Sequence, residues 1–258
     1  MSRVVPGEVL LEARAVAKHF GGVKALRDVS LSIRRGEVYG LIGPNGAGKT
    51  TFFNCLTGLY VPDGGGFSFA GKPLAADAPH EAAACGIGRT FQNIRLFGNM
   101  TAIQNVMVGR HVRTRAGVLG AIFSTSATRA EEAAIYGKAL DLLHYVGIAE
   151  RAEDLARNLS YGDQRRLEIA RALATEPQLL CLDEPAAGMN GAETAELRAL
   201  IEGIRQDGTT ILLIEHDVKL VMGLCDRVAV LDYGALVIED VPAVVQRDPR
   251  VIEAYLGA

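Results

Sequence analysis

Residues 38–59 contain the feature that most restricts the fold of this chain. Val38–Ile42 is continuously apolar and predicts a buried strand, whereas Thr51–Leu59 has the apolar spacing of a helix. Between them, GPNGAGKT at 43–50 fits the pattern G-x-x-x-x-G-K-[ST] without deviation. A strand that enters such a loop and a helix that leaves it are the context of a phosphate-binding loop. The segment therefore predicts an α/β fold that binds a nucleotide.

The residue types of this loop suit a nucleoside triphosphate. Glycine backbones can turn their N–H groups toward phosphate oxygens, and the helix that follows adds the positive end of its dipole. Lys49 is expected to neutralise the β- and γ-phosphates, and the Thr50 hydroxyl to ligate Mg²⁺. An ordinary glycine-rich turn, the alternative, would not need both flanking elements. The predicted nucleotide contacts are Gly43, Pro44, Asn45, Gly46, Ala47, Gly48, Lys49, Thr50 and Thr51.

A second apolar strand ends in two carboxylates, in LLCLDEP at 179–185. Ligands bind at the carboxyl ends of parallel strands, which is where this strand would carry Asp183. We expect Asp183 to hold Mg²⁺ through water, and Glu184 to orient and deprotonate the attacking water. The alternative is a pair of solvated carboxylates at a strand end, which a phosphate loop upstream disfavours.

Three single residues are further candidates. Gln92, in RTFQNIRLF, could contact both Mg²⁺ and the attacking water through its amide and so sense the γ-phosphate. His216 follows the predicted strand Thr210–Ile214 and could hydrogen-bond the γ-phosphate, although a lone histidine after a strand is usually structural. Phe20, just before two glycines, is either a core aromatic or a surface on which adenine stacks.

The string LSYGDQ at 159–164 predicts the start of a helix. Ser160 with Asp163 three residues later is typical of a capping box, and a capped helix N-terminus also binds anions. The phosphate loop already has its own helix and lysine. This second anion site, with Ser160 and Gly162, is therefore expected to serve the γ-phosphate of another subunit.

Composition and charge exclude several classes of protein. A net charge of −3 offers no basic excess, which argues against nucleic acid as the main ligand. The four cysteines are scattered without metal-site spacing, as in a reducing cytosol. No stretch approaches the roughly 18 apolar residues that span a bilayer, and the N-terminus has acidic residues where a signal peptide is apolar. Residues 111–130 are interpreted as a helix packed on its own domain or as a surface that touches a membrane subunit.

The order of these motifs resembles that of the ATP-binding subunit of ABC transporters over nearly the whole chain. The closer resemblance is to the larger of the two ATPase subunits of bacterial high-affinity branched-chain amino-acid importers. Tyr161 at the third signature position and Met189-Asn190 are typical of that subfamily. The strings that carry the resemblance are HFGGVKAL at 19–26, RTFQNIRLFGNMTAIQNVMVG at 89–109, LSYGDQRRLEIARALAT at 159–175, EPAAGMN at 184–190 and VIEAYLG at 251–257.

The resemblance implies an α/β fold with a P-loop NTPase (RecA-like) core, an antiparallel β subdomain and an inserted α-helical subdomain. A single ABC ATPase domain is expected over 1–258. The nucleotide-binding core and β subdomain would occupy 1–95 and 176–240, the helical signature subdomain 96–175, and a C-terminal helical tail 241–258.

The resemblance also implies an ATPase that uses ATP and Mg²⁺ at the cytoplasmic face of the inner membrane. It would pair with itself or with a sister ATPase, beneath two membrane permeases. A periplasmic binding protein would deliver the amino acid to these permeases. Each composite site would take Lys49, Thr50, Gln92, Asp183, Glu184 and His216 from one subunit and Ser160 and Gly162 from the other. The region after Gln92 is the expected permease contact.

Other classes fit the sequence less well. ATPases of urea or amide importers are similar, and a non-transport ABC ATPase stays an alternative, although such proteins often carry two ATPase halves in one chain. A DNA-repair or chromosome ATPase of this head type would need a long coiled coil between its phosphate loop and its signature, and the heptads for one are missing. A GTPase would need an Asn-Lys-x-Asp string, which this sequence does not contain.

Overall fold

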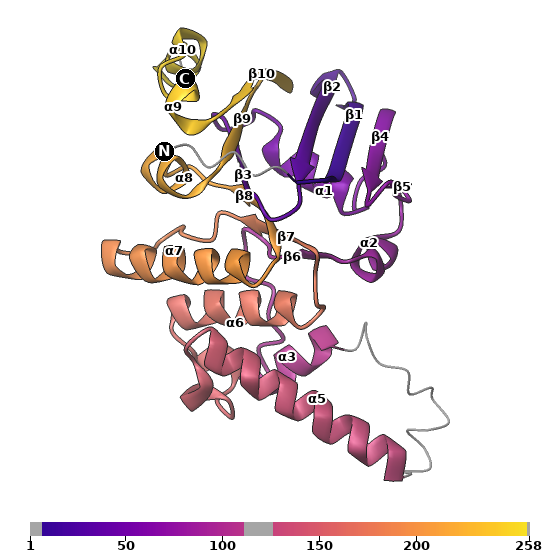
Figure 1. Cartoon of the computed structure of the whole chain (residues 1–258), viewed down its shortest axis with the longest axis vertical. Coiled ribbons are helices and arrows are strands. Elements are labelled where there is room, and N and C mark those ends of the chain that lie inside the picture. Colours follow the sequence, from indigo (N-terminus) through magenta and orange to yellow (C-terminus); the bar gives the residue numbers. More distant parts are fainter. Residues whose placement is uncertain (1–6, 111–125, 257–258) are drawn as a thin grey trace. The chain divides into compact units, whose positions relative to one another are not determined.

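The computed structural model describes residues 7–110 and 126–256 and divides the chain into two compact units (Figure 1). Unit 1 combines the chain up to Arg89 with the chain from Gln178 onward, and unit 2 runs from Thr90 to Pro177. The phosphate loop and the strand that carries Asp183 belong to unit 1, whereas Gln92 and the LSYGDQ string belong to unit 2.

Unit 1 is built on a six-stranded sheet in the order β10-β9-β3-β8-β7-β6. The parallel strands are β9 (Arg227–Asp232), β3 (Val38–Ile42), β8 (Thr210–Ile214), β7 (Leu179–Asp183) and β6 (Ile87–Arg89), and β10 (Ala235–Asp240) runs antiparallel to β9. Every residue of β3, β7 and β8 is buried. Strands covered on both faces are continuously apolar, which explains why these three were predicted from sequence.

A four-stranded antiparallel sheet forms the second layer of unit 1, in the order β2-β1-β4-β5. Its strands are β2 (Val23–Arg34), β1 (Val9–Phe20), β4 (Gly64–Phe69) and β5 (Lys72–Pro73), and Figure 1 shows the first three side by side. Leu11, Val16 and Ile33 of this sheet share one core with Phe52 and Phe53 of α1 (Lys49–Leu56) and with one face of the six-stranded sheet. The predicted antiparallel β part is confirmed.

The first strand is longer than its alternation predicts. The alternation of residues in the sequence predicts a strand from Val9 to Ala15, but β1 continues to Phe20. Ala15 has a positive φ of 46°, and the pairing of β1 with β2 shifts register between Ala13 and Val16. A bulge of this kind breaks the alternation of faces without ending the strand.

Helices cover the other face of the six-stranded sheet. α7 (Gly191–Gln206) and α8 (Val218–Leu224) bury Leu197, Ile201, Leu220 and Val221. A Cβ atom on Gly40 of β3 would lie 3.0 Å from both Val221 and the Cys225 Sγ atom, so this glycine lets α8 approach the sheet closely. The remaining helices of unit 1 in the described residues are α2 (Pro79–Cys85), α9 (Pro242–Val245) and α10 (Pro249–Leu256).

Unit 2 is helical, as predicted. Its elements are α3 (Ala102–Arg110), α5 (Ser126–Tyr145), α6 (Tyr161–Leu173) and the 3₁₀ turns η2 (Ala149–Arg151) and η3 (Ala156–Asn158). The apolar positions at helical spacing, among them Leu143 and Leu167, are fully buried. Residues 111–125 lie outside the described residues, so both interpretations of 111–130 stay predictions.

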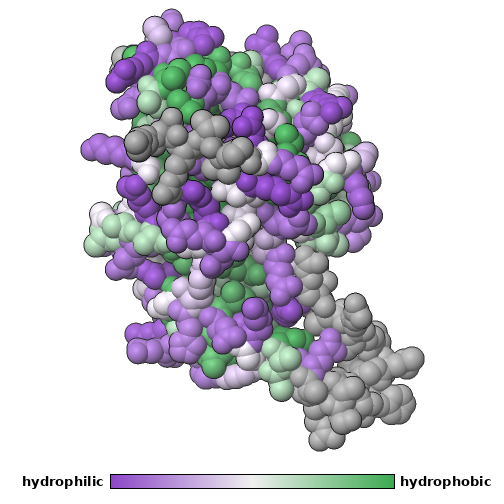
Figure 2. Space-filling model, in the orientation of Figure 1, coloured by the Kyte–Doolittle hydropathy of each residue, from purple (hydrophilic) through white to green (hydrophobic). Residues whose placement is uncertain are grey.

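The face of the molecule in Figure 2 carries mostly hydrophilic residues, with hydrophobic residues in separate patches between them. Among the helices of the described residues, none combines the length and the apolar character needed to cross a membrane.

Arg227, at the start of β9, joins several strands of unit 1. Its guanidinium donates to the Ser32 carbonyl at 2.9 Å, pairs with Glu37 at 3.3 Å and contacts Glu239. It also lies over the Tyr39 ring, 5.3 Å from the centroid. The Glu37 side chain is only 2% exposed, and burial raises its pKa while the Arg227 charge opposes that rise.

We expect Arg227→Met to lower the free energy of unfolding by about 3–5 kcal/mol, because it leaves a buried carboxylate without its cation. The loss should be greater at pH 8 than at pH 5. The folded-state pKa of Glu37 is raised, so the stability that this group contributes is present at low pH and lost as pH rises through that pKa. Without Arg227 the pKa rises further, which extends the loss to higher pH.

Urea unfolding at the two pH values checks this expectation. Arg14→Met is the matched control, because Arg14 forms an exposed pair with Glu12 and its loss should change stability very little. An equal loss at both pH values would contradict the role of Arg227 as the counter-charge of Glu37.

Candidate active site

Three parallel strands of unit 1 end at the same level. Leu41 of β3 and Asp183 of β7 both pair with Ile214 of β8. The phosphate loop begins two residues after Leu41, and Glu184 and His216 follow the other two strand ends. The register of the sheet thus brings all predicted catalytic segments of unit 1 to one edge, the carboxyl edge at which ligands of parallel sheets bind.

The phosphate loop is folded around the ammonium group of Lys49. The Nζ atom donates to the Gly43 carbonyl at 2.6 Å and to the Pro44 carbonyl at 2.9 Å, and the side chain is buried. Burial lowers the pKa of Lys49, and the carboxylates of Glu184 and Asp183 oppose this shift. The ammonium therefore has carbonyl partners that phosphate oxygens could replace, with the gain of a charge-assisted contact.

Two glycines of the loop are required by close backbone approaches. Gly43 has a φ of 149°, and a Cβ atom there would lie 2.1 Å from the Leu231 carbonyl oxygen. Gly48 has a φ of 105°, and its Cβ atom would lie 2.5 Å from the Ala25 carbonyl oxygen. The side chains of Asn45 and Thr50 are exposed, and that of Thr51 is half-buried. The Thr50 hydroxyl, in the first turn of α1, is accessible to a ligand.

The three predicted polar groups beyond the loop lie close together. His216 Nε2 is 2.5 Å from Glu184 Oε1, and the Glu184 amide donates to the Ile214 carbonyl at 2.9 Å. Glu184 has a positive φ of 49°, uncommon for a glutamate, which turns the chain sharply after Asp183. The Asp183 side chain is only 1% exposed. A carboxylate held by an imidazole at this edge can orient a water molecule and accept its proton.

The predicted site does not include Glu215, yet this buried carboxylate fixes the segments on either side of the catalytic pair. Its Oε1 accepts from the Ala186 amide at 2.7 Å and its Oε2 from the His216 amide at 3.1 Å. Burial is the main cause that raises its pKa. The signal in the sequence was a charged residue at the end of the apolar run TILLI, before His216.

Arg89 is a second residue that the predicted site omits. Its NH1 atom donates to Asn54 Oδ1 and to Thr57 Oγ1, each at 2.8 Å, and its NH2 atom lies 3.3 Å from Asp183 Oδ2. The guanidinium lies 5.5 Å from the Phe53 ring centroid and its side chain is 8% exposed. Arg89 thus joins the helix that follows the phosphate loop to the buried carboxylate of β7.

Phe20 lies at the end of β1 and is 44% exposed. Its ring makes an edge-to-face contact with Tyr60, with 5.3 Å between the centroids, and the Lys18 ammonium lies 5.6 Å from its centroid. Phe20 is therefore no core residue, and part of its ring is open to a ligand.

Three of the predicted site residues, Gln92, Ser160 and Gly162, belong to unit 2. Gln92 is exposed. Ser160 is the N-cap of α6, as predicted: its hydroxyl accepts from the Asp163 amide at 3.1 Å and donates to the Asp163 carboxylate at 2.8 Å. Gly162 lies in the first turn of this helix. The helix N-terminus and its capped hydroxyl suit the binding of an anion.

Within unit 2, the buried Arg165 joins the segment of Gln92 to the start of α6. Its NH1 atom donates to the Phe91 carbonyl at 2.8 Å, and its NH2 atom donates to the Gln92 carbonyl and, at 2.9 Å, to the Tyr161 hydroxyl. Tyr161 therefore supplies a contact that a glycine at this position could not make. Sequence patterns did not reveal Arg165, because arginines at helical spacing usually face solvent.

The described residues contain no cluster of three or more His, Cys, Asp or Glu side chains that could hold a metal ion. Mg²⁺ in nucleotide sites commonly takes one or two protein ligands and completes its shell with phosphates and water. An accessible hydroxyl at Thr50 and a buried carboxylate at Asp183 suit that pattern.

Comparisons with known proteins agree with this geometry. The family model "ABC transporter" matches residues 26–187. The chain belongs to the ABC transporter family. It is an ATP-binding cassette, and ATP hydrolysis coupled to transport is general in this family. A second model, "Branched-chain amino acid ATP-binding cassette transporter", matches residues 239–258.

Individual relatives are similar over almost their full length. The high-affinity branched-chain amino acid transport ATP-binding protein LivG of Salmonella typhimurium is 46% identical over 96% of this chain and 98% of its own. A nucleotide-free ATP-binding cassette from an ABC transporter has a TM-score of 0.85 and 31% identity, over 97% of this chain and 100% of that chain. A cassette solved as a dimer bound to ADP and phosphate has a TM-score of 0.77 and 25% identity, over 90% of this chain and 99% of that chain.

We expect Glu184→Gln to bind ATP and to hydrolyse it at least ~100-fold more slowly, because an amide cannot accept the proton of the attacking water. ATP binding by calorimetry and phosphate release together test this. Glu81→Gln, an exposed change in α2, is the control and should leave both unchanged. Turnover at the wild-type rate in Glu184→Gln would remove Glu184 as the base.

We expect Arg89→Met to reduce kcat at least ~10-fold and to lower the melting temperature, because Asp183 would lose a buried cationic contact. Arg89→Lys should recover the melting temperature better than kcat, since lysine keeps the charge but not the fork that spans α1 and β7. Differential scanning calorimetry and steady-state kinetics on both variants check this. Full kcat in Arg89→Met would show that the orientation of Asp183 does not depend on this contact.

Proposed function

We propose that this chain is the ATPase subunit of a membrane importer for amino acids, with branched-chain amino acids as substrates. The ATPase part is supported by the meeting of Lys49, Asp183, Glu184 and His216 at one edge of the sheet. The substrate part is supported by the family match over 239–258 and by the names of the similar ATPases. During transport, the permeases and the binding protein, and not this chain, would carry the amino acid.

In the proposed reaction, the loop from Gly43 to Thr51 binds the phosphates of ATP, and Lys49 exchanges its carbonyl partners for phosphate oxygens. Phe20 offers its exposed ring to adenine. Thr50, Asp183 and Gln92 would hold Mg²⁺, which when bound neutralises charge on the phosphates.

Glu184 would accept the proton of the attacking water. His216 holds the Glu184 carboxylate in place and can donate to the γ-phosphate. Because Glu215 fixes both neighbouring segments through backbone N–H groups, it would hold the two catalytic side chains in a defined position.

The N-terminus of α6, with Ser160 and Gly162, would complete the ATP site of a second subunit. A capped helix N-terminus attracts anions, and a related cassette has been solved as a dimer with ADP and phosphate. The partner is a second copy of this chain or a sister ATPase. ATP binding would close the pair and hydrolysis would reopen it.

The exposed part of unit 2 after Gln92 would transmit this motion to two membrane permeases, fed by a periplasmic binding protein. Phe97 and Met100 are exposed large apolar residues in this segment, at 48% and 38% exposure, and suit a protein contact. In this proposed arrangement, the chain would lie at the cytoplasmic face of the inner membrane.

The test is affinity purification of the tagged chain from its native membranes, followed by mass spectrometry. Two multi-span permeases and a second ATPase should be recovered, and the companion binding protein should bind leucine, isoleucine or valine. A companion protein that binds urea or an amide would overturn the substrate. Recovery of soluble partners alone would overturn transport and leave the ATPase chemistry intact.

A further inference from the structure

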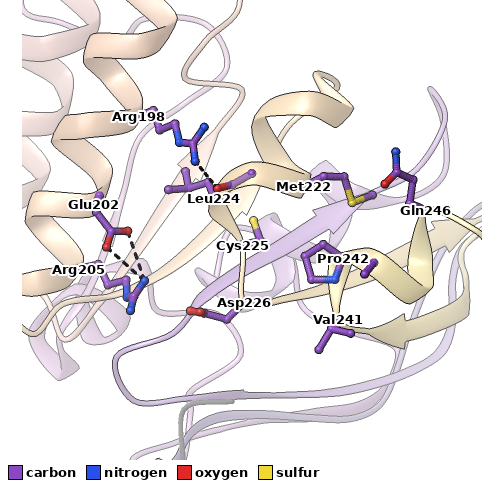
Figure 3. Close-up of a pocket in the computed structure, with 12 residues that line it drawn as sticks. Arg198, Glu202, Arg205, Met222, Leu224, Cys225, Asp226, Val241, Pro242 and Gln246 are labelled. Atoms are coloured by element: carbon purple, nitrogen blue, oxygen red, sulfur yellow. Dashed lines mark hydrogen bonds and ion pairs between the residues drawn. The ribbon is translucent and has the colours of Figure 1, made fainter. Parts of the chain in front are cut away.

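A pocket of about 550 Å³ lies in unit 1 between α7, α8 and α9 (Figure 3). Figure 3 shows Arg198, Glu202 and Arg205 of α7 on one side and Val241 and Pro242 on the other. Leu224 and Cys225, which are buried, lie between the two sides. The volume is in the range that small-molecule sites occupy, about 300–1,000 Å³.

The charged groups of the pocket differ in their partners. Arg205 and Glu202 form an ion pair at 3.3 Å, so their charges compensate each other. Arg198 is exposed and donates to the Gly223 carbonyl at 2.6 Å. Within residues 7–110 and 126–256, no carboxylate lies within ion-pair distance of Arg198. A fourth charged group of the lining, Asp226, accepts from the Val38 amide at 2.9 Å. Arg198 therefore adds a local positive charge at the rim that an anion could neutralise.

The guanidinium of Arg198 is held against the end of α8. A Cβ atom on Gly223 would lie 3.1 Å from the Arg198 NH1 atom and 3.3 Å from its Cζ atom. The absence of a side chain at Gly223 lets the flat group lie close to the helix, and its remaining N–H groups can form a fork toward a carboxylate.

The rest of the lining combines the polar residues Asp226 and Gln246 with a group of apolar side chains, which sets the second requirement for a ligand. Met222, Leu224 and Cys225 come from α8 and the turn after it, and Val241 and Pro242 from the start of α9. An apolar floor next to one uncompensated guanidinium fits a small aliphatic body that carries one carboxylate.

The pocket is separate from the phosphate loop. Asp226, which lines it, accepts from the Val38 amide at 2.9 Å, and this bond lies at the amino ends of β3 and β9. The phosphate loop follows the carboxyl end of β3, at Ile42. A ligand of the pocket and ATP would therefore bind at opposite ends of the same strand and would not compete.

Two of the three helices that line the pocket, α7 and α8, begin beside catalytic segments. The N-cap of α7 is Asn190, six residues after Glu184, and the N-cap of α8 is Asp217, directly after His216. A ligand that contacts both helices would restrain their relative motion.

We propose that this pocket binds a small branched aliphatic carboxylate and that its occupancy slows ATP hydrolysis. The binding site is inferred from the lining residues alone. Its physiological meaning rests on the proposed function, because an imported branched-chain amino acid and the corresponding 2-oxo acid both belong to this chemical class.

Calorimetric titration of the full chain tests the site, with leucine, 4-methyl-2-oxopentanoate and 3-methylbutylamine as probes. At least one carboxylate should bind both in the absence and in the presence of saturating ATP, and the amine should not bind. The two carboxylate probes distinguish an amino acid from an oxo acid as the ligand. Arg198→Met should weaken binding at least ~10-fold, a loss of about 1.4 kcal/mol.

Two further variants separate the guanidinium contact from a general effect on the fold. Gly223→Ala keeps the charge but displaces Arg198, and should also weaken binding. Arg247→Met removes an exposed arginine that does not line the pocket and should bind the probes as the wild type does.

The inference would be overturned if neither carboxylate bound at roughly 10 mM probe, a concentration that detects even millimolar affinity. Unchanged affinity in Arg198→Met would also overturn it, and so would competition between the carboxylate and ATP. An ATPase rate unaffected by saturating ligand would overturn the regulatory part. None of these results bears on permease recovery, so the proposed function is tested separately.

Discussion

The parallel register of β3, β8 and β7 is the constraint on which the site of unit 1 depends. Because Leu41 and Asp183 are both paired with Ile214, three loops from distant parts of the sequence leave the sheet at one level. The phosphate loop, Glu184 and His216 follow from these three strand ends. A shift of one residue in any of the pairings would reverse the faces of a strand and move its loop away from the others.

Buried charged groups hold this arrangement together at some cost in desolvation. Arg89 bridges the helix after the phosphate loop and the carboxylate of Asp183, and Glu215 holds the backbone on both sides of the catalytic pair. In unit 2, Arg165 holds the Gln92 segment to the start of α6. Buried ion pairs are weak evidence for stability, but one that is broken leaves an uncompensated charge. We infer that these contacts are kept because they fix catalytic geometry.

Sequence patterns predicted the features that depend on local chemistry. Features that follow from a few neighbouring residues could be predicted. These are the apolar runs of β3, β7 and β8, the glycine loop and the Ser160 cap. The roles of Arg89 and Arg165 could not be predicted from the sequence, because each depends on contacts with residues that are distant in the chain. The full length of β1 was also missed, because the bulge near Ala15 interrupts the alternation that defines a strand.

In the proposed dimer, two subunits share each ATP site, and paired variants test this sharing directly in dimers purified through two different tags. Ser160→Arg should damage the site of the opposite subunit, and Glu184→Gln the site of its own. Placed on opposite subunits, the two changes fall on one site, and about half of the hydrolysis rate should remain, because the other site is intact. Placed on the same subunit, they disable both sites and should abolish hydrolysis. The reverse result, with activity kept when both changes lie on the same subunit, would show that each subunit hydrolyses ATP by itself.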